Sequence, residues 1–164
     1  MSRGFVKEDD QEEAPIIPPR AALPAGETNY VTPNGLKELK EEEEKLTAER
    51  ANLDKENETE RRRAQAVIDG NLKLLRERIS TARVLDPNEQ PVDEVRFGAL
   101  VELKQNGNIQ KFQIVGVDEA DVKKQKIAFV APIAKAVTGK KVGDKIDFKL
   151  GEEIRKLEIL KITY

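Results

Sequence analysis

The sequence contains no cysteine, no histidine and no tryptophan among its 164 residues. Without cysteine and histidine, the chain cannot form a disulfide, a Cys/His zinc site, a thiol nucleophile or a histidine-based catalytic triad. It also lacks the one side chain that ordinarily titrates near neutral pH, so acid–base catalysis would need a perturbed carboxylate, lysine or tyrosine. We therefore expect a protein that is not an enzyme in its own right.

Long hydrophobic runs and a surplus of charge of one sign are also missing. The formal net charge is only -2 although charged residues make up 37% of the chain, which argues against a general nucleic-acid binder. No apolar run approaches the roughly 18 residues needed to span a bilayer, so we expect no membrane contact. Residues 1–10 lack the apolar core of a secretory signal. A soluble cytoplasmic protein is the expectation.

The composition changes along the chain and predicts four segments. Residues 1–29 contain four prolines and an acidic stretch over 8–13, with neither helical nor strand periodicity. This composition is typical of a disordered N-terminal tail. Within it, the pair Ile16 and Ile17 could dock a partner, and a plain solvated tail is the alternative.

Residues 30–85 have the pattern of an antiparallel coiled-coil hairpin. Thr32 is followed by Pro33, which is typical of a helix start. The seam is weaker where Glu43 and Arg50 occupy it, and a polar break without apolar residues spans 54–60. One continuous helix, which would need a partner chain, is the alternative. Two apolar stripes at coiled-coil spacing flank the break: Leu36, Leu39, Leu46 and Leu53, then Ala64, Val67, Ile68, Leu72, Leu75, Ile79 and Ala82.

The last part of the chain predicts a small, mostly antiparallel sheet with one short helix. Residues 86–94 contain two prolines that cannot continue a helix, and they form the expected linker. From residue 95 to residue 164 apolar residues alternate, and 105–108 has the composition of a hairpin turn. Residues 132–137 predict a short helix that ends before Gly139. The fold class is therefore α+β.

These residues resemble the bacterial Gre transcript-cleavage factors (the GreA/GreB family) over about residues 30–164. Residues 32–36 resemble the start of the family's coiled coil and residues 82–86 resemble its end. The stretches 97–101, 114–121 and 132–144 match the family's second domain, in order and at the expected spacing. The resemblance implies an N-terminal antiparallel coiled-coil hairpin followed by an FKBP-like β-sheet domain with one short helix.

The resemblance also implies a partner and a mode of action. The globular domain would bind RNA polymerase at the rim of its secondary channel, with Pro132, Ile133 and Ala134 at the contact. The hairpin would enter that channel as a monomer and reach the nascent RNA only indirectly, with Arg61, Arg62 and Arg63 as candidates for contact with the RNA backbone. The chain would have no cofactor of its own. Tip carboxylates at Asp54, Glu56, Glu58 and Glu60 are the implied catalytic group, and Asp54 and Glu56 would help to hold a polymerase Mg²⁺ during RNA cleavage.

The tip departs from the family pattern in ways that leave the mode of action open. Only Glu56 and Asn57 align cleanly with the family's acidic tip. The hairpin is also shorter by about 8 residues per arm, which at about 1.5 Å per residue is roughly 12 Å of reach. One alternative is therefore a regulator that occupies the channel without cleavage.

Three further features have a structural and a functional interpretation. The arginines at 61–63 could equally form ion pairs on a solvated helix, since acidic and basic residues balance across the hairpin. Residues 118–121 spell a helicase-like tetrad, which we interpret as a loop after a strand because no phosphate-binding loop accompanies it. The FKBP-like fold also suggests a prolyl isomerase or chaperone module, although fold alone is weak evidence for activity.

Overall fold

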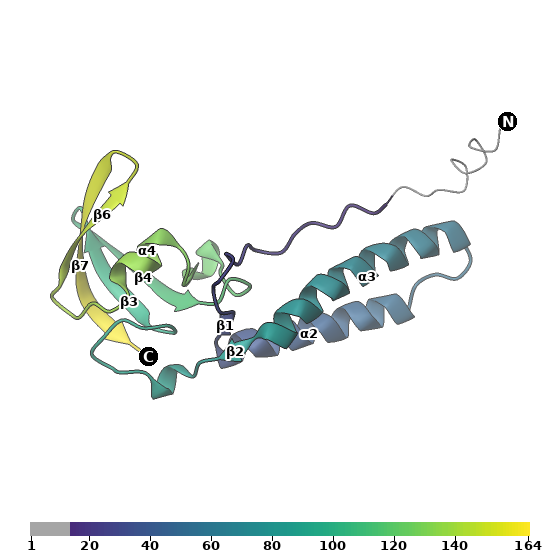
Figure 1. Ribbon diagram of the computed structural model, residues 1–164, viewed down its shortest axis with the longest axis horizontal. Coiled ribbons are helices and arrows are strands. Elements are labelled where there is room, and N and C mark those ends of the chain that lie inside the picture. Colours follow the sequence, from purple (N-terminus) through teal and green to yellow (C-terminus); the bar gives the residue numbers. More distant parts are fainter. Residues whose placement is uncertain (1–13) are drawn as a thin grey trace.

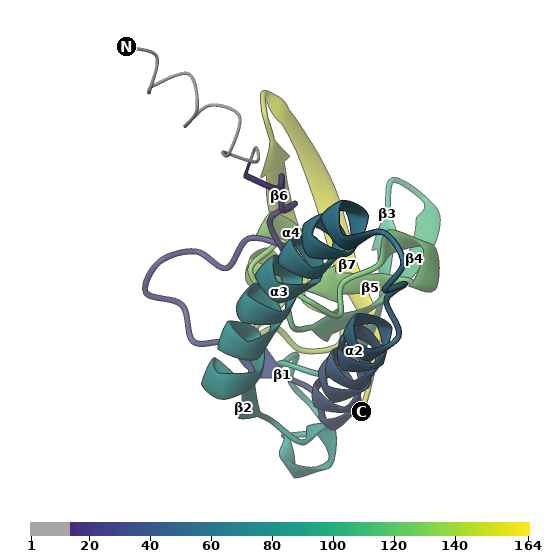
Figure 2. The same ribbon diagram turned by 90° about the vertical axis from the view of Figure 1, so that its right-hand side faces the viewer.

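The computed structural model describes residues 14–164 and contains two parts, a long helical hairpin and a curled β-sheet domain (Figure 1). The hairpin consists of α2 (Pro33–Ala51) and α3 (Glu58–Thr81), which run side by side in opposite directions (Figures 1 and 2). The predicted antiparallel hairpin is confirmed, and the alternative of one continuous helix is wrong. The connection between the helices spans residues 52–57 and overlaps the polar segment expected at 54–60, whose last three residues already belong to α3.

The two arms are joined by an apolar base and by ion pairs farther out. Val31, Leu39 and Leu75 are buried together at the base of the hairpin. At the seam positions that the sequence marks as weak, Glu43 accepts a hydrogen bond from Arg76 at 3.0 Å, and Arg50 donates to Asp69 at 2.6 Å. The polar seam residues therefore find partners of opposite charge on the other arm.

The second part is a five-stranded sheet in the order β5-β4-β3-β7-β6. All neighbouring strands are antiparallel except β4 and β5, which are parallel. Asn106 and Gly107 both have positive φ, at 50° and 83°, as a tight hairpin turn between β3 and β4 requires. The strands are β3 (Leu100–Gln105), β4 (Asn108–Val115), β5 (Lys126–Ala128), β6 (Lys145–Leu150) and β7 (Glu153–Thr163).

The sheet curls around α4 (Pro132–Val137), whose inner face completes the core. Ala134 and Val137 of α4 are fully buried against strand residues such as Val101, Leu103 and Ile159. The alternation of these strand residues follows the period of two seen in the sequence. The α+β class and the hairpin-plus-sheet architecture are both confirmed.

Short elements connect the two parts. A two-stranded parallel pair, which the sequence did not predict, is formed by β1 (Tyr30–Val31) and β2 (Arg83–Val84). It closes the base of the hairpin, because β1 enters α2 and β2 leaves α3. Two single 3-10 turns lie at Pro87–Glu89 and Val122–Lys124.

The segment before β1 differs in part from the disordered tail that we expected. Residues 1–13, including the acidic stretch, lie outside the described residues. Residues 14–29 contain no helix or strand, but they run beside α3 and make specific contacts with it (Figure 1). Ile17 and Arg20 supply an apolar anchor and a charged anchor, so this segment does not behave as a purely solvated tail.

None of the helices between residues 14 and 164 combines the length and the apolar character that crossing a bilayer requires.

Tyr164 ties the C-terminus to the segment that precedes the sheet. Its hydroxyl accepts a hydrogen bond from the Arg96 backbone N–H at 2.7 Å and donates one to the Glu94 carbonyl at 2.5 Å. Burial raises the pKa of Tyr164 above its usual value. Folding therefore favours the protonated phenol, which adds stability below the unfolded pKa of about 10 and loses it as pH rises through the higher folded pKa.

We predict that Tyr164→Phe lowers the free energy of unfolding by about 1 kcal/mol at pH 7, since two hydrogen bonds are lost. The difference from the wild type should shrink above pH 10, because only the wild type carries the phenol that then ionises. Urea unfolding at a series of pH values measures this, with Tyr30→Phe as the control for general alkaline loss. A difference that stays constant from pH 7 to 11 would contradict the prediction.

Candidate functional site

The tip of the hairpin is a short polar loop shaped by bonds from side chains to the backbone. Asp54 accepts a hydrogen bond from the backbone N–H of Glu56 at 2.9 Å. Asn57 caps α3 by accepting from the backbone N–H of Glu60 at 3.1 Å. These local bonds turn the chain between the two arms and leave the loop's acidic side chains exposed to solvent.

The four tip carboxylates do not converge on one point. Glu58 and Glu60 lie in the first turn of α3, where negative charge is favoured by the helix dipole. Because they are two residues apart on a helix, their side chains point in widely different directions. Within residues 14–164 no group of three or more acidic side chains is arranged to hold a metal ion. The geometry thus provides single exposed carboxylates, not a cage.

The three consecutive arginines lie within the first two turns of α3. Arg62 and Arg63 are exposed, while Arg61 is half-buried. Successive helix positions are about 100° apart, so the three side chains do not share one face. They surround the first turns of α3 with positive charge close to the acidic loop.

The predicted docking residues open α4 in the sheet domain. Pro132 occupies the first helical position and is exposed, and Ile133 is half-buried against the core. Ala134 has no exposed surface, because it faces the strands beneath the helix. A direct contact of the Ala134 side chain with a partner is therefore excluded in this conformation, and Pro132 with the outer part of Ile133 offers the accessible surface.

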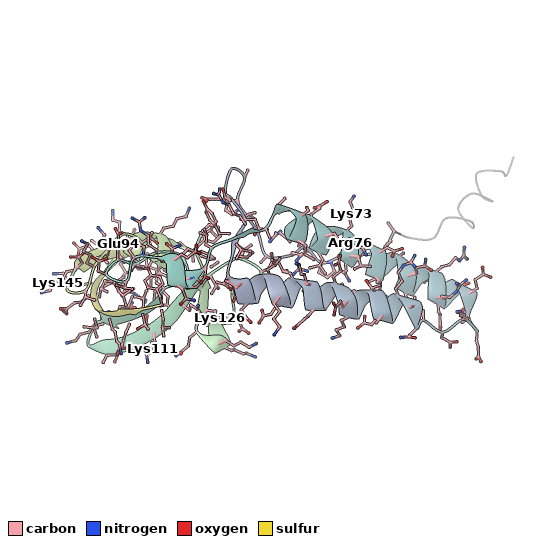
Figure 3. The ribbon with its side chains drawn as sticks, turned by 90° about the horizontal axis from the view of Figure 1, so that it is seen from below. Lys73, Arg76, Glu94, Lys111, Lys126 and Lys145 are labelled. Atoms are coloured by element: carbon pink, nitrogen blue, oxygen red, sulfur yellow. The ribbon has the colours of Figure 1, made fainter. Side chains whose placement is uncertain are left out.

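A buried polar cluster, which the sequence interpretation missed, lies where the hairpin joins the sheet. The carboxylate of Glu119, almost fully buried, accepts a hydrogen bond from the Thr32 hydroxyl at 2.7 and 2.8 Å. The same hydroxyl accepts from the Gly35 backbone N–H at 2.9 Å and so caps α2. Lys126 lies 3.7 Å from the carboxylate, at the junction of α2 and the sheet (Figure 3). Glu119 thus fixes the start of α2 to the sheet domain.

The neighbouring carboxylate, Asp118, binds the other arm. Its side chain is only 5% exposed and accepts hydrogen bonds from Arg78 of α3 and from Arg20, each at 2.9 Å. The interpretation of residues 118–121 as a loop after a strand is therefore incomplete, because two of its carboxylates anchor both arms. A run of acidic residues directly after a predicted buried strand was the available clue.

Three aromatic rings complete the junction. Tyr30 of β1 packs on Phe97 and Phe129 with ring centroids 6.0 and 5.6 Å apart, and the two phenylalanines are themselves 5.6 Å apart. Offset and edge-to-face packing of this kind stabilises beyond the burial of area alone. The base of the hairpin is thus held to the sheet by rings as well as by carboxylates.

Known proteins are similar in sequence to this chain over most of its length. A family model described as "Transcription elongation factor, GreA/GreB, C-term" matches residues 90–164. A transcription elongation factor GreA from Thermodesulfovibrio yellowstonii is 32% identical over 151 residues, which cover 82% of this chain and 96% of that relative. The chain belongs to the GreA/GreB family. Members of this family are transcription elongation factors and not enzymes themselves.

A further relative supports this assignment. The GreA factor of Acidiphilium cryptum is 40% identical over 105 residues, covering 63% of this chain and 67% of that relative. Among solved structures, a GreA/GreB factor from Nitrosomonas europaea covers 82% of this chain and 98% of its own, at 22% identity and a TM-score of 0.41. The Gfh1 protein of Thermus thermophilus, a GreA factor homologue, covers 84% and 100% at 21% identity and a TM-score of 0.38.

We predict that Thr32→Val destabilises the protein by about 2 kcal/mol or more. The substitution keeps the shape of the side chain but removes the cap of α2 and a donor to a buried carboxylate, each of which contributes about 1 kcal/mol or more. Urea unfolding followed by circular dichroism measures the change. Thr47→Val on the exposed face of the same helix is the control and should change stability by less than about 0.5 kcal/mol. Equal effects of the two substitutions would show that the Thr32–Glu119 bond has no special role.

Proposed function

We propose that this Gre-family factor binds RNA polymerase through its sheet domain and inserts its hairpin into the polymerase secondary channel. The observation that supports the proposal best is the shape of the molecule: a narrow helical hairpin projects from a small sheet domain and ends in a polar, exposed tip (Figure 1). With 19 residues, α2 extends about 28 Å, which suits a probe for a pore. The membership in the GreA/GreB family supports the choice of partner.

We further propose that the hairpin occupies the channel and modulates elongation without stimulating RNA cleavage. Catalysis through a shared Mg²⁺ would need carboxylates within about 2.1 Å of the ion. Here Asp54 is engaged in the turn of the loop, and Glu58 and Glu60 diverge around α3. Together with the roughly 12 Å of missing reach, these features favour occupancy over catalysis. Cleavage assisted by Asp54, Glu56, Glu58 or Glu60 is the competing mode.

In this proposal, the arginines act at the tip and α4 acts at the rim. Arg61, Arg62 and Arg63 surround the part of α3 that enters the channel first, where the phosphates of extruded RNA would meet them. The exposed Pro132 and the outer part of Ile133 contribute to docking. The rival interpretation as a prolyl isomerase loses three aromatic candidates for a proline pocket, since Tyr30, Phe97 and Phe129 pack on one another.

The mode of action is tested on backtracked polymerase complexes with end-labelled RNA. We expect that the wild-type chain alone yields no shortened RNA, and that it reduces cleavage stimulated by an added GreA factor in a dose-dependent way. Shortened RNA that disappears in the Glu56→Ala, Glu58→Ala variant, but persists in the matched Glu44→Ala, Glu49→Ala variant of α2, would instead establish cleavage. A chain that neither cleaves nor competes would overturn the proposal as a whole.

Docking at α4 predicts the effect of a charge at its first position. Pro132→Glu should weaken binding to core polymerase by about tenfold, which corresponds to about 1.4 kcal/mol, because a charge is placed in the contact. The fold should persist, since the side chain is exposed and acidic residues are tolerated at helix N-termini. Val92→Glu, at an exposed position outside α4, is the control. Unchanged affinity of the Pro132 variant in biolayer interferometry would exclude this part of α4 from the interface.

A further inference from the structure

The segment before the hairpin lies along α3 and reaches the junction. Ile17 packs over Gly70, where an added Cβ atom would lie 2.6 Å from the Ile17 Cδ1 atom. A glycine in the interior of a helix carries a conformational cost, so its presence here is explained by the side chain that it admits. The segment that contains Ile17 and Arg20 therefore packs closely on the hairpin, and it runs beside α3 (Figures 1 and 2).

Arg20 is the point at which three parts of the chain meet. Its guanidinium donates to both carboxylate oxygens of Glu42 on α2, at 2.6 and 3.1 Å, and to Asp118 of the sheet domain at 2.9 Å. The Arg20 side chain is 19% exposed. Hydrogen bonding to Glu42 raises the pKa of Arg20 further above its usual value. The planar fork of arginine suits this two-sided contact, which a single ammonium group cannot reproduce.

Arg78 connects the same cluster to α3. It donates to the second oxygen of Asp118 at 2.9 Å and to the backbone carbonyl of Ala21. Two guanidinium groups and two carboxylates thus alternate in one cluster that includes the N-terminal segment, both arms and the sheet domain. The side chains of Arg78 and Asp118 are 16% and 5% exposed, whereas that of Glu42 is 41% exposed, so salt should weaken the bonds to Asp118 less than the bond between Arg20 and Glu42.

The position of the cluster allows it to restrain the angle between the hairpin and the sheet domain. The contacts that Thr32, Tyr30 and Arg78 make with the sheet domain all lie at the base of the hairpin. Contacts confined to the base resist a change in the angle of the hairpin less well than a contact farther along an arm does. Glu42 lies ten residues beyond Thr32 along α2, about 15 Å away at about 1.5 Å per residue. A contact at that distance therefore adds to the restraint that the contacts at the base provide.

We propose that residues 17–21 form an intramolecular brace, with Arg20 as its positioning residue, that sets the direction of the hairpin relative to the sheet domain. The brace acts in the free protein and does not depend on the polymerase. If the experiment contradicts the brace, the proposed binding in the polymerase channel is not affected. If the channel binding is contradicted, the brace is not affected either. For a hairpin that acts at its tip, a small change of angle at the base becomes a large displacement at the far end.

The absence of cysteine makes the brace directly measurable. Spin labels on Lys55→Cys at the tip and Asn108→Cys at the start of β4, both exposed positions, report the tip-to-sheet distance by double electron–electron resonance. We expect a single narrow distribution for the labelled full-length chain. Adding Arg20→Ala should broaden it at least twofold, while the thermal unfolding of the sheet domain stays the same. Arg20→Lys should broaden it to an intermediate width, because lysine reaches only one of the two carboxylates.

A matched control separates the brace from general loosening of the hairpin. Arg50→Ala also removes an arginine–carboxylate pair, but that pair joins the two arms without touching the sheet domain. Its distribution should remain as narrow as that of the wild type. Ile17→Ser removes the apolar anchor and should broaden the distribution in the same direction as Arg20→Ala. An unchanged width in the Arg20→Ala variant, or equal broadening in Arg20→Ala and Arg50→Ala, would overturn the proposal.

Discussion

Two adjacent carboxylates, Asp118 and Glu119, are buried between the hairpin and the sheet domain. The position of the hairpin relative to the sheet domain depends on the hydrogen bonds and ion pairs that these two carboxylates make. A buried charge is costly unless hydrogen bonds and opposite charges surround it. Glu119 accepts a hydrogen bond from the hydroxyl that caps α2. Asp118 accepts hydrogen bonds from guanidinium groups of α3 and of the segment before β1. Any large displacement of the hairpin would leave one of these carboxylates without donors, so the junction has a defined geometry.

Polar contacts suit this task better than an apolar interface would. Apolar burial is not directional and tolerates sliding, whereas hydrogen bonds weaken steeply as their angles depart from linearity. The aromatic group around Tyr30 supplies apolar attraction between the hairpin and the sheet domain, while the apolar base around Leu75 holds the two arms together. The carboxylates then select one orientation among those that apolar contact alone would allow.

The sequence predicted the elements better than the contacts between them. The turn at Asn106 and Gly107 and the short helix before Gly139 follow from local rules and were correctly placed. The polar break expected at 54–60 overlaps the connection between the helices, but residues 58–60 already belong to α3. The parallel pair of β1 and β2 was missed because two-residue strands leave no periodic pattern and pair residues about fifty positions apart. The ion pair between Arg20 and Asp118 was missed for a similar reason. Its two members are 98 residues apart, and nothing in the local sequence distinguishes either of them from a solvated charge.

The candidate site was only partly predictable because its function depends on direction rather than on residue type. Composition identifies an acidic tip, but it does not tell whether Glu58 and Glu60 converge or diverge, which follows from their places in the first turn of α3. The stretch 132–134 shows the same limit: helical geometry turns Ala134 into the core and leaves Pro132 at the surface. The position that the tip of such a hairpin reaches then depends on the orientation of its base. A stiff pair of helices transmits the orientation of its first turn to its tip, so residues that bind no partner can still determine where the tip carboxylates lie.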